Sequence, residues 1–482
     1  MKKTVIFLIL LLALPACSYN AATGDNQFTL LMSESQEQQI GAENHGKVLK
    51  SYGVVKDSAL TSYVNRIGQS LARDTERANV AYTFTLLDSP QVNAFAVPGG
   101  YIYITRGILA LANDEAEMAS VLAHEIGHIT ARHSAERHTT GVFTQLGAGV
   151  LANVIGDAGV GNALGAGAGL YISSYSRDQE READTLGVRY LSYDDYAPFA
   201  MSGFLGQLNR NEQYETALQG QSQKTTNYYF RSHPLTSERI RLAATEAKNK
   251  LTDRPVKRNR QQYLAKINGM IFGDTPEQGF IRRGTFLHPI MGFKFKAPDN
   301  FRLVNLPTKV VATNDKGVLA EFDMRKSKEP LTVTQALAKW IPAEGAKWIP
   351  KTVSFGGFKA ATATADVAVK GKPYFLRRTV IAAHNNRFYR FQSLMPKAQQ
   401  QTFDGPLYGM AKSFRFLSAA EKVAAKPLRI KTFTAKKGDT IYSIARNIPH
   451  QEQPQAFFRM LNGLDAEDAL QVGQMYKTIV ER

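Results

Sequence analysis

Hydrophobic positions recur at helical spacing over most of residues 27–270, but two short stretches in this region alternate instead. These are YTFTLLDS at 82–89 and NAFAVPGGYIYIT at 93–105. Alternation predicts strands, because every second side chain of a strand points to the same face. Pro98-Gly99-Gly100 predicts a turn between two strands. The pattern therefore predicts a mainly helical domain with a small sheet.

Over residues 280–417 alternation dominates. The strand-like stretches are GFKFKAPDNFRLV, KTVSFGGFKAATATADVAV, YFLRRTVIAA and RFYRFQSLM, whereas TVTQALAKWIP has helical spacing. This predicts a small α+β domain, and it holds no constellation of catalytic residue types. The composition of residues 418–428 predicts a linker. We expect the chain as a whole to be an α+β protein.

A predicted helix contains the stretch SVLAHEIGHITARH at 120–133. Asn113 and Asp114 can cap its start, and Asp114 and Glu117 have the spacing of a capping box. His133 would point about 140° away from His128 if the helix continued that far, so we interpret His133 as structural.

His124 and His128 are four residues apart, which places them on one helix face with Cβ atoms about 5–6 Å apart. Two imidazoles at this separation can bind one zinc ion, with bonds of about 2.0–2.1 Å. Glu125 lies beside them, where a general base for water is needed. The alternative is an amphipathic helix that carries two surface histidines.

A third zinc ligand can come from SRDQEREADTLG at 176–187. Glu180 and Asp184 are again four apart, so Glu180 can complete a His, His, Glu set. Asp184 can then accept the second ring N–H of a ligand histidine. Spacing alone does not exclude Glu182, and a solvated charged helix is the alternative.

Four motifs, in their content and in their order along the chain, resemble the zinc metalloprotease family of the prenyl-protein (CAAX) endopeptidases and the bacterial HtpX and BepA proteases. They are HEIGH, the S-R-x-x-E-x-x-A-D pattern some fifty residues later, NAFAVPGGYIYITRGIL at 93–109 and SHPLTSERI at 232–240. The resemblance spans roughly residues 60–245 and implies a zincin of the gluzincin type in residues 17–270.

The resemblance also implies roles for single residues. It places one zinc ion per chain on His124, His128 and Glu180, with Glu125 as catalytic base and Asp184 supporting a ligand. His233 would lie near the active site, where it donates a hydrogen bond to the tetrahedral intermediate or occupies the open zinc position in a latent state. A loop histidine before a proline is the alternative for His233. The strand residues Asn93, Ala94, Phe95 and Ala96 are our candidates for pairing with an extended substrate.

The N-terminus, MKKTVIFLILLLALPAC, predicts a lipoprotein signal peptide over residues 1–16. Its apolar run from Val5 to Leu14 is shorter than the roughly 20 residues that span a bilayer. Cys17, the one cysteine of the chain, would be lipidated, and Ser18 after it favours the outer membrane. The weakly hydrophobic, Gly/Ala-rich stretch Gly141–Ile172 predicts close-packed helices or a movable flap, so we expect membrane contact through the lipid anchor only.

Residues 429–482 resemble a LysM module, a strand–helix–helix–strand fold that commonly binds N-acetylglucosamine polymers, so peptidoglycan is a candidate partner. From residue 251 onward the chain carries 38 Lys and Arg against 18 Asp and Glu. A basic region suggests an acidic neighbour. For an exported lipoprotein that neighbour is a lipid, lipopolysaccharide or wall polymer rather than nucleic acid.

These features together predict a zinc metalloendopeptidase of the bacterial periplasm, anchored to the inner leaflet of the outer membrane. Its expected substrates are unfolded or assembling envelope proteins. The alternative is a non-proteolytic assembly factor or chaperone for outer-membrane or cell-wall proteins, in which zinc only braces the fold.

Overall fold

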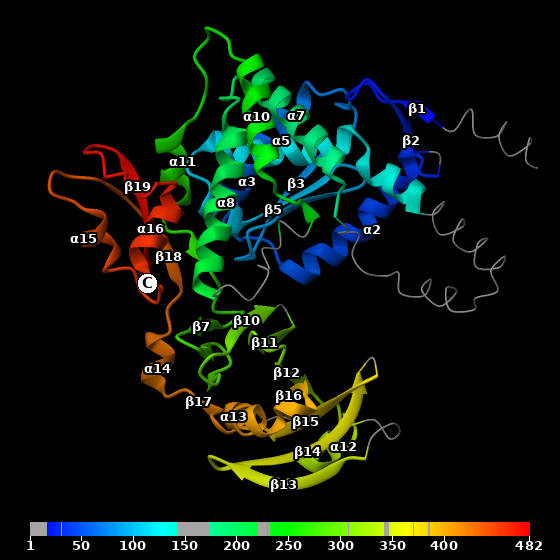
Figure 1. Cartoon of the computed structure of the whole chain (residues 1–482), viewed down its shortest axis with the longest axis vertical. Coiled ribbons are helices and arrows are strands. Elements are labelled where there is room, and N and C mark those ends of the chain that lie inside the picture. Colours follow the sequence, from blue (N-terminus) through cyan, green and yellow to red (C-terminus); the bar gives the residue numbers. More distant parts are fainter. Residues whose placement is uncertain are drawn as a thin grey trace, which may run out of the picture. The chain divides into compact units, whose positions relative to one another are not determined.

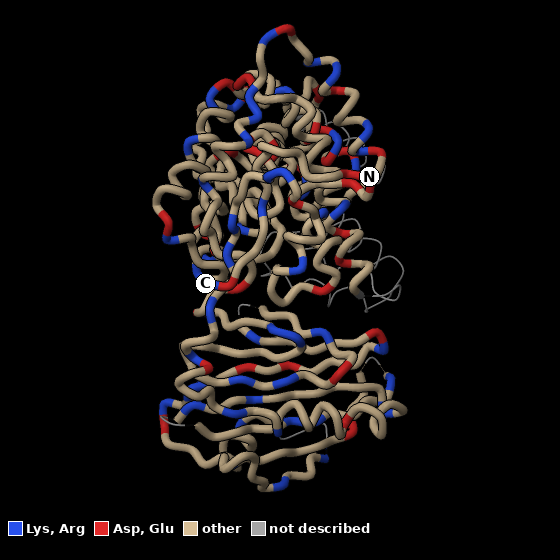
Figure 2. The backbone as a smooth tube through the Cα atoms, turned by 90° about the vertical axis from the view of Figure 1, so that its left-hand side faces the viewer, with Lys and Arg blue, Asp and Glu red and all other residues tan. Residues whose placement is uncertain are grey.

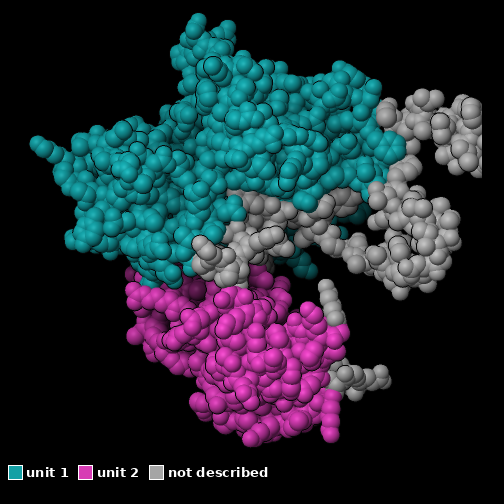
Figure 3. All heavy atoms as spheres, in the orientation of Figure 1, with its two compact units in different colours: residues 1–272, 430–480 teal, residues 273–429, 481–482 magenta. Residues whose placement is uncertain are grey.

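The computed structural model describes residues 17–29, 31–141, 174–219, 229, 232–306, 308–341, 347–369, 371–383 and 386–482. The predicted signal peptide, residues 1–16, lies outside the described residues, as do residues 142–172 of the predicted Gly/Ala-rich segment. Two compact units divide the chain (Figure 3). Unit 1 comprises Met1–Phe272 and Ile430–Val480, and unit 2 comprises Gly273–Arg429 and Glu481–Arg482. Among the described residues, none of the helices has both the length and the apolar character that a membrane span requires.

Unit 1 is mainly helical (Figure 1). Its helices outside the C-terminal segment are α2 (Glu34–Tyr52), α3 (Ser58–Arg73), α4 (Arg106–Leu111), α5 (Glu115–Thr130), α7 (Arg177–Tyr193), α8 (Ala200–Gln219), α10 (Ser237–Asn249) and α11 (Arg260–Ile267). Its strands before the C-terminal segment are β1 (Cys17–Tyr19), β2 (Asn26–Phe28), β3 (Thr83–Leu87), β4 (Ala94–Val97), β5 (Tyr101–Thr105) and β6 (Ile271–Phe272).

The small sheet has the order β3-β5-β4, with β5 parallel to β3 and antiparallel to β4. The predicted strands are confirmed, and Pro98 to Gly100 form the turn between β4 and β5. Gly99 and Gly100 have φ of +82° and +92°, a region that side-chain-bearing residues rarely adopt. A Cβ atom on Gly99 would also lie 2.8 Å from Cα of Gln38.

Helix α5 is buried along its whole length and packs against α3, α7, α8 and the strands β4 and β5. Asp114 caps the helix as the sequence predicts, but the predicted capping box is not closed, because the side chain of Glu117 bonds to Asn113 and not to Asp114. The Asp114 carboxylate accepts a hydrogen bond from the backbone N–H of Glu117 at 2.8 Å, and Glu117 accepts one from the backbone N–H of Asn113 at 2.7 Å. The start of the helix is therefore fixed by its own first residues.

Unit 2 has the α+β character that the sequence predicts. A seven-stranded antiparallel sheet has the order β10-β11-β12-β16-β15-β14-β13, and a four-stranded sheet has the order β17-β9-β8-β7. The strands are β7 (Phe280–Arg282), β8 (Thr285–His288), β9 (Phe293–Lys296), β10 (Arg302–Leu306), β11 (Lys309–Thr313), β12 (Leu319–Lys326), β13 (Ile349–Phe355), β14 (Phe358–Val369), β15 (Lys372–Ala382), β16 (Arg387–Pro396) and β17 (Arg415–Phe416). The helices are α12 (Val333–Ala338), η2 (Lys397–Gln399), α13 (Gln400–Lys412) and α14 (Ala419–Ala424).

The C-terminal segment has the strand–helix–helix–strand order that the sequence predicts. Its elements are β18 (Leu428–Thr434), α15 (Ile441–Ala445), α16 (Pro454–Asn462) and β19 (Met475–Glu481), and the strands form a sheet of order β19-β18-β6. The predicted organisation, a separate module after a flexible linker, differs from the structure. Residues 419–424 of the expected linker are helical, and residues 430–480 pack into unit 1.

One buried lysine explains how the C-terminal segment becomes part of unit 1. The Lys477 ammonium donates hydrogen bonds to the carbonyls of Ala110, Leu111 and Ala112 at 2.8, 3.2 and 2.7 Å. These carbonyls stand at the C-terminal end of α4, where a helix leaves its last acceptors unsatisfied. Burial lowers the pKa of Lys477, while the charge of Glu117 favours its protonated form. Lys477 therefore caps a helix that lies more than three hundred residues earlier in the chain.

We expect Lys477→Met to lower the free energy of unfolding of unit 1 by about 2–4 kcal/mol, because it leaves buried carbonyls without donors. Lys437→Met, which changes an exposed lysine of the same segment, is the matched control. Urea unfolding followed by circular dichroism measures both variants. Equal unfolding midpoints for the two would contradict this role of Lys477.

Candidate metal centre

Two donors of the candidate metal centre come from one face of α5. His124 and His128 lie one helical turn apart, and their Nε2 atoms are 3.1 Å from each other. Both side chains are buried, with exposed fractions of 1% and 2%. Burial holds the pKa of His128 well below its usual value, which favours the neutral imidazole that a metal ion requires.

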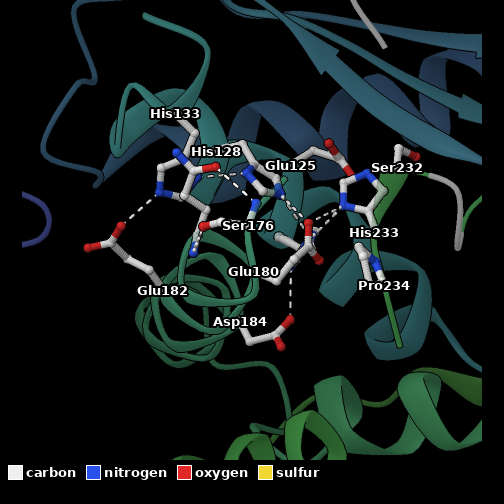
Figure 4. Close-up of polar contacts among 12 residues, drawn as sticks. Glu125, His128, His133, Ser176, Glu180, Glu182, Asp184, Ser232, His233 and Pro234 are labelled. Carbon is white, nitrogen blue, oxygen red and sulfur yellow. Dashed lines mark hydrogen bonds and ion pairs between the residues drawn. The ribbon is translucent and has the colours of Figure 1, made fainter. Parts of the chain in front are cut away.

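Helix α7 brings the third donor. Ser176 caps this helix in a capping box with Gln179, so α7 begins one turn before Glu180. The Glu180 carboxylate has one oxygen 3.5 Å from Nε2 of His128 (Figure 4). Its other oxygen lies 3.6 Å from Nε2 of His124. Spacing in the sequence did not decide whether Glu180 or Glu182 is the third donor. The structure places Glu180 beside the two histidines.

Small residues allow α5 and α7 to approach each other closely. A Cβ atom on Gly127 would lie 3.0 Å from the carbonyl oxygen of Ala183, and one on Gly187 would lie 3.2 Å from the backbone nitrogen of His124. Both glycines belong to the motifs that carry the donors. A larger side chain at either position would therefore separate the two helices that form the centre.

His233 supplies a fourth donor atom. Its Nδ1 lies 2.9 Å from Oε1 of Glu180 and 3.3 Å from Nε2 of His124. The four ligand atoms of His124, His128, Glu180 and His233 all lie within 4.8 Å of one another, and all four residues are buried. The structure therefore brings the three predicted ligands and His233 to a single point.

The geometry of this cluster fits zinc. Zinc bonds of about 2.0–2.2 Å in tetrahedral coordination place neighbouring ligand atoms about 3.3 Å apart. The separations between the donor atoms, from 2.9 Å for His233 to Glu180 up to 3.6 Å for His124 to Glu180, lie around this value. Three nitrogens and one carboxylate oxygen are also a donor set that zinc accepts.

Glu125 lies beside the donors without being one of them. Its Oε1 is 3.6 Å from Nε2 of His233, and both of its oxygens are buried without a hydrogen-bond partner among the described residues. Burial raises the pKa of Glu125, against the opposing influence of His233, His124 and the backbone N–H of Ala96. A buried carboxylate with free lone pairs at this position is able to take a proton.

A buried ion pair holds the donors in place. Asp184 has one oxygen 2.9 Å from Nδ1 of His124, as predicted for a residue that orients this ligand. Arg239, on α10, donates to both oxygens of Asp184 at 2.7 and 2.8 Å, and its Nη1 lies 2.6 Å from Oε2 of Glu180. Burial alone would raise the pKa of both carboxyl groups, but Arg239 and the histidines hold the pKa of Glu180 and Asp184 below their usual range.

Arg239 is a residue of this centre that sequence reasoning missed. It stands in the motif SHPLTSERI, from which only His233 was singled out. Two aromatic side chains were missed as well, since no spacing indicates them. Tyr175 stacks on the ring of His128 with centroids 3.7 Å apart, and Tyr229 stacks on His233 at 4.6 Å.

The prediction that His133 points away from His128 is wrong. That prediction assumed a continuous helix, but α5 ends at Thr130 and Arg132 has φ of +53°. The chain therefore turns back, and Nδ1 of His133 lies 2.8 Å from Nδ1 of His128. The other nitrogen of His133 lies 2.7 Å from Glu182, so these two residues form a second chain of contacts behind a candidate ligand.

One of the predicted substrate-binding residues, Ala96, has its backbone N–H close to Glu125. Ala94 to Ala96 belong to β4, which pairs only with β5 among the described strands of its sheet, and Asn93 precedes it. The backbone N–H of Ala96 is among the groups that lower the pKa of Glu125. One edge of β4 therefore stands at the candidate centre.

Residues 58–247 match the model of peptidase family M48. The buried donor set agrees with a metallopeptidase domain in this part of the chain. The family implies a metal ion, in agreement with the buried donor cluster. The predicted resemblance is thereby confirmed.

Curated relatives match about half of the chain. The beta-barrel assembly-enhancing protease of Yersinia pestis is 30% identical over 264 residues, which are 51% of this chain and 52% of the relative. The protein of the same name from Escherichia coli K12 is 29% identical over 244 residues, 49% of this chain and 48% of the relative. A mitochondrial metalloendopeptidase of Schizosaccharomyces pombe is 27% identical over 217 residues, 44% of this chain and 59% of the relative. The chain spans about half the length of the beta-barrel assembly-enhancing proteases that it matches.

The likeness to solved structures is low. A protein of Mycobacterium tuberculosis described as LpqN, involved in cell envelope biogenesis, aligns with 26% of this chain and 83% of its own. Its identity is 12% and its TM-score is 0.22, which supports no argument about function.

We expect Arg239→Met to weaken zinc binding about 10–100-fold, because Asp184 and Glu180 lose the cation that fixes them. Arg241→Met, an exposed position of the same helix, is the matched control. Competition with a chromogenic chelator measures the affinity, and circular dichroism verifies that both variants are folded. If Arg239→Met binds zinc as tightly as Arg241→Met, Arg239 has no part in holding the ligands.

Proposed function

We propose that this protein is a zinc-dependent endopeptidase with one zinc ion per chain. The observation that carries the proposal is the buried cluster of His124, His128, Glu180 and His233, with the unpartnered carboxylate of Glu125 beside it. The names of the similar beta-barrel assembly-enhancing proteases and of the mitochondrial metalloendopeptidase support the same activity.

Each residue of the centre has a part in this proposal. His124, His128 and Glu180 hold the metal ion, which supplies Lewis-acid activation of water and of the scissile carbonyl. Glu125 takes the proton of the attacking water and passes it to the leaving amine. Asp184, with Arg239 behind it, keeps the ring of His124 oriented toward the metal.

His233 is proposed to occupy the fourth coordination position in a latent state. Its Nδ1 lies as close to Glu180 as a ligand of the same ion would, and a zinc centre with four protein ligands has no open position for water or substrate. Activity then requires that His233 withdraw.

We expect His233→Ala to retain one zinc ion per chain and to cleave an unfolded peptide substrate faster than the wild type. The reason is that the fourth position becomes open to water. Metal analysis and a fluorogenic peptide assay provide the two measurements. Slower cleavage with zinc retained would assign His233 to hydrogen bonding in the reaction, and unchanged kinetics would remove it from the mechanism.

An extended substrate would add to the edge of β4. Within the candidate segment Asn93–Ala96, the backbone N–H of Ala96 lies next to Glu125, whereas the backbone groups of Asn93 already bond to Thr105. Backbone pairing binds peptides with little demand on their sequence. This mode of binding suits unfolded proteins, whose chains are available in extended form.

The envelope is the proposed place of action. The signal-peptide pattern and Cys17 support a lipid anchor at the inner leaflet of the outer membrane, and the names of the bacterial relatives support assembling or misfolded envelope proteins as substrates. The LysM-like segment, residues 429–482, is a candidate for peptidoglycan binding, although its packing into unit 1 gives it a structural role as well.

We expect Glu125→Gln to retain zinc and to lower peptide cleavage at least about 100-fold, since the amide cannot accept the proton of water. Glu43→Gln, on the exposed face of α2, is the matched control. Cleavage is measured on the same fluorogenic peptide after metal content is verified. Full activity of Glu125→Gln would refute the mechanism, whereas growth of a deletion strain restored by this variant would favour the non-proteolytic assembly factor.

A further inference from the structure

A second candidate site lies in unit 2, away from the metal donors in sequence and in chemistry. One face of the seven-stranded sheet forms the main core of the unit, with Ala320, Phe322 and Phe391 among its members. On the opposite face, α12 covers a smaller apolar cluster that includes Leu337, Val380 and Phe388. Beyond this cluster the same face becomes polar and contains a cavity of about 270 Å³.

Strand alternation explains why polar side chains gather in this cavity. Glu321 and Asp323 alternate with core residues along β12, and they stand opposite Gln392 and Arg390 of β16. Arg378 of β15 stands opposite Gln392 in turn. Figure 2 shows the charged positions of unit 2 distributed along neighbouring strands. Three adjacent strands thus present one polar surface, because all these positions share a face.

Most charges of the cavity are already paired. Lys309 forms an ion pair with Glu321, and Arg390 donates two hydrogen bonds to Asp323. Arg378 differs from both cations. Arg378 donates hydrogen bonds to the side-chain oxygen of Gln392 at 2.7 Å and to the backbone carbonyl of Trp340, and it has no carboxylate partner among the described residues.

Arg378 is also partly desolvated and lies near a like charge. Burial and the positive charge of Arg390 together lower its pKa from the usual value. Its guanidinium lies 5.0 Å from the ring centre of Trp340 and 5.3 Å from that of Trp348, contacts that compensate only part of the lost hydration. A partly buried cation with this environment favours an anionic ligand, because an oxyanion supplies both charge and hydrogen-bond acceptors.

The other groups that line the cavity can form hydrogen bonds with the hydroxyl groups of a ligand and pack against its ring. Glu321, Asp323 and Gln392 retain lone pairs and N–H groups beyond their present bonds, and a sugar ring both donates and accepts hydrogen bonds. Trp340 lines the same cavity with a large apolar surface. The indole N–H of Trp348, the second ring in contact with Arg378, is buried without a hydrogen-bond partner among the described residues.

We propose that this cavity binds a small carbohydrate that carries a carboxylate. The carboxylate pairs with Arg378, the hydroxyl groups bond to Gln392 and the acidic pair, and the ring lies against Trp340. The volume is close to the lower end of about 300 Å³ for small-molecule sites, which limits the bound part to one sugar ring. The inference is independent of the proteolytic function proposed above.

The tryptophans of the chain provide a fluorescent probe that tests this proposal. It has two tryptophans in total, and both contact Arg378. Intrinsic tryptophan fluorescence of the full-length protein therefore reports on the cavity alone. We expect a saturable change with D-glucuronate at constant ionic strength, and none with D-glucose, acetate or inorganic phosphate.

Variants of the cavity separate binding from general effects. Arg378→Gln should weaken glucuronate binding at least about tenfold, the value of one charge-assisted hydrogen bond. Arg302→Gln, an exposed arginine of β10, should bind as the wild type does. Gln392→Leu provides a second loss-of-binding variant in case Arg378→Gln does not fold, which a thermal melt detects.

The remaining outcomes overturn the proposal. No saturable change up to about 10 mM glucuronate would mean that the polar face is only solvated. An equal response to glucose would remove the carboxylate from the recognition, and an equal response to acetate or phosphate would indicate a simple anion site. Equal weakening by Arg378→Gln and Arg302→Gln would indicate nonspecific electrostatics.

Discussion

The close approach of α5 and α7 is the constraint on which the candidate metal centre depends. The two histidines come from one helix and Glu180 from the other, so the donors meet only if the backbones nearly touch. Gly127 and Gly187 provide this contact at the surface between the helices. A glycine inside a helix costs about 0.5–1 kcal/mol relative to alanine, and here that cost permits the approach of the two helices.

Burial of the centre then creates an electrostatic requirement. Glu125, Glu180 and Asp184 are carboxyl groups with almost no exposure, and such groups are unstable as anions without nearby cations. Arg239 neutralises part of this charge through contacts to Glu180 and Asp184, and the proposed zinc ion would neutralise more. Glu125 alone has no hydrogen-bond partner for its oxygens among the described residues. The structure therefore distinguishes the carboxylates that hold the site from the one that is free to react.

The same reasoning connects the C-terminal segment to the protease fold. Lys477 is buried because it caps α4, and α4 leads directly to α5, whose first turn contains Glu117. The C-terminal segment thus supports the helix that carries two of the candidate metal donors.

The sequence by itself determined the elements and the chemistry of the centre. Helical periodicity, the cap at Asp114 and the four-residue spacing of His124 and His128 are local properties, and local contacts along one helix follow directly from residue order. The motif resemblance then selected Glu180. Only the tertiary structure decided what lies far apart in the chain: that Arg239 joins Asp184 and Glu180, that His133 turns back onto His128, and that Lys477 reaches α4. These contacts depend on the path of the backbone between elements, including a residue with positive φ, and no spacing in the sequence contains that information.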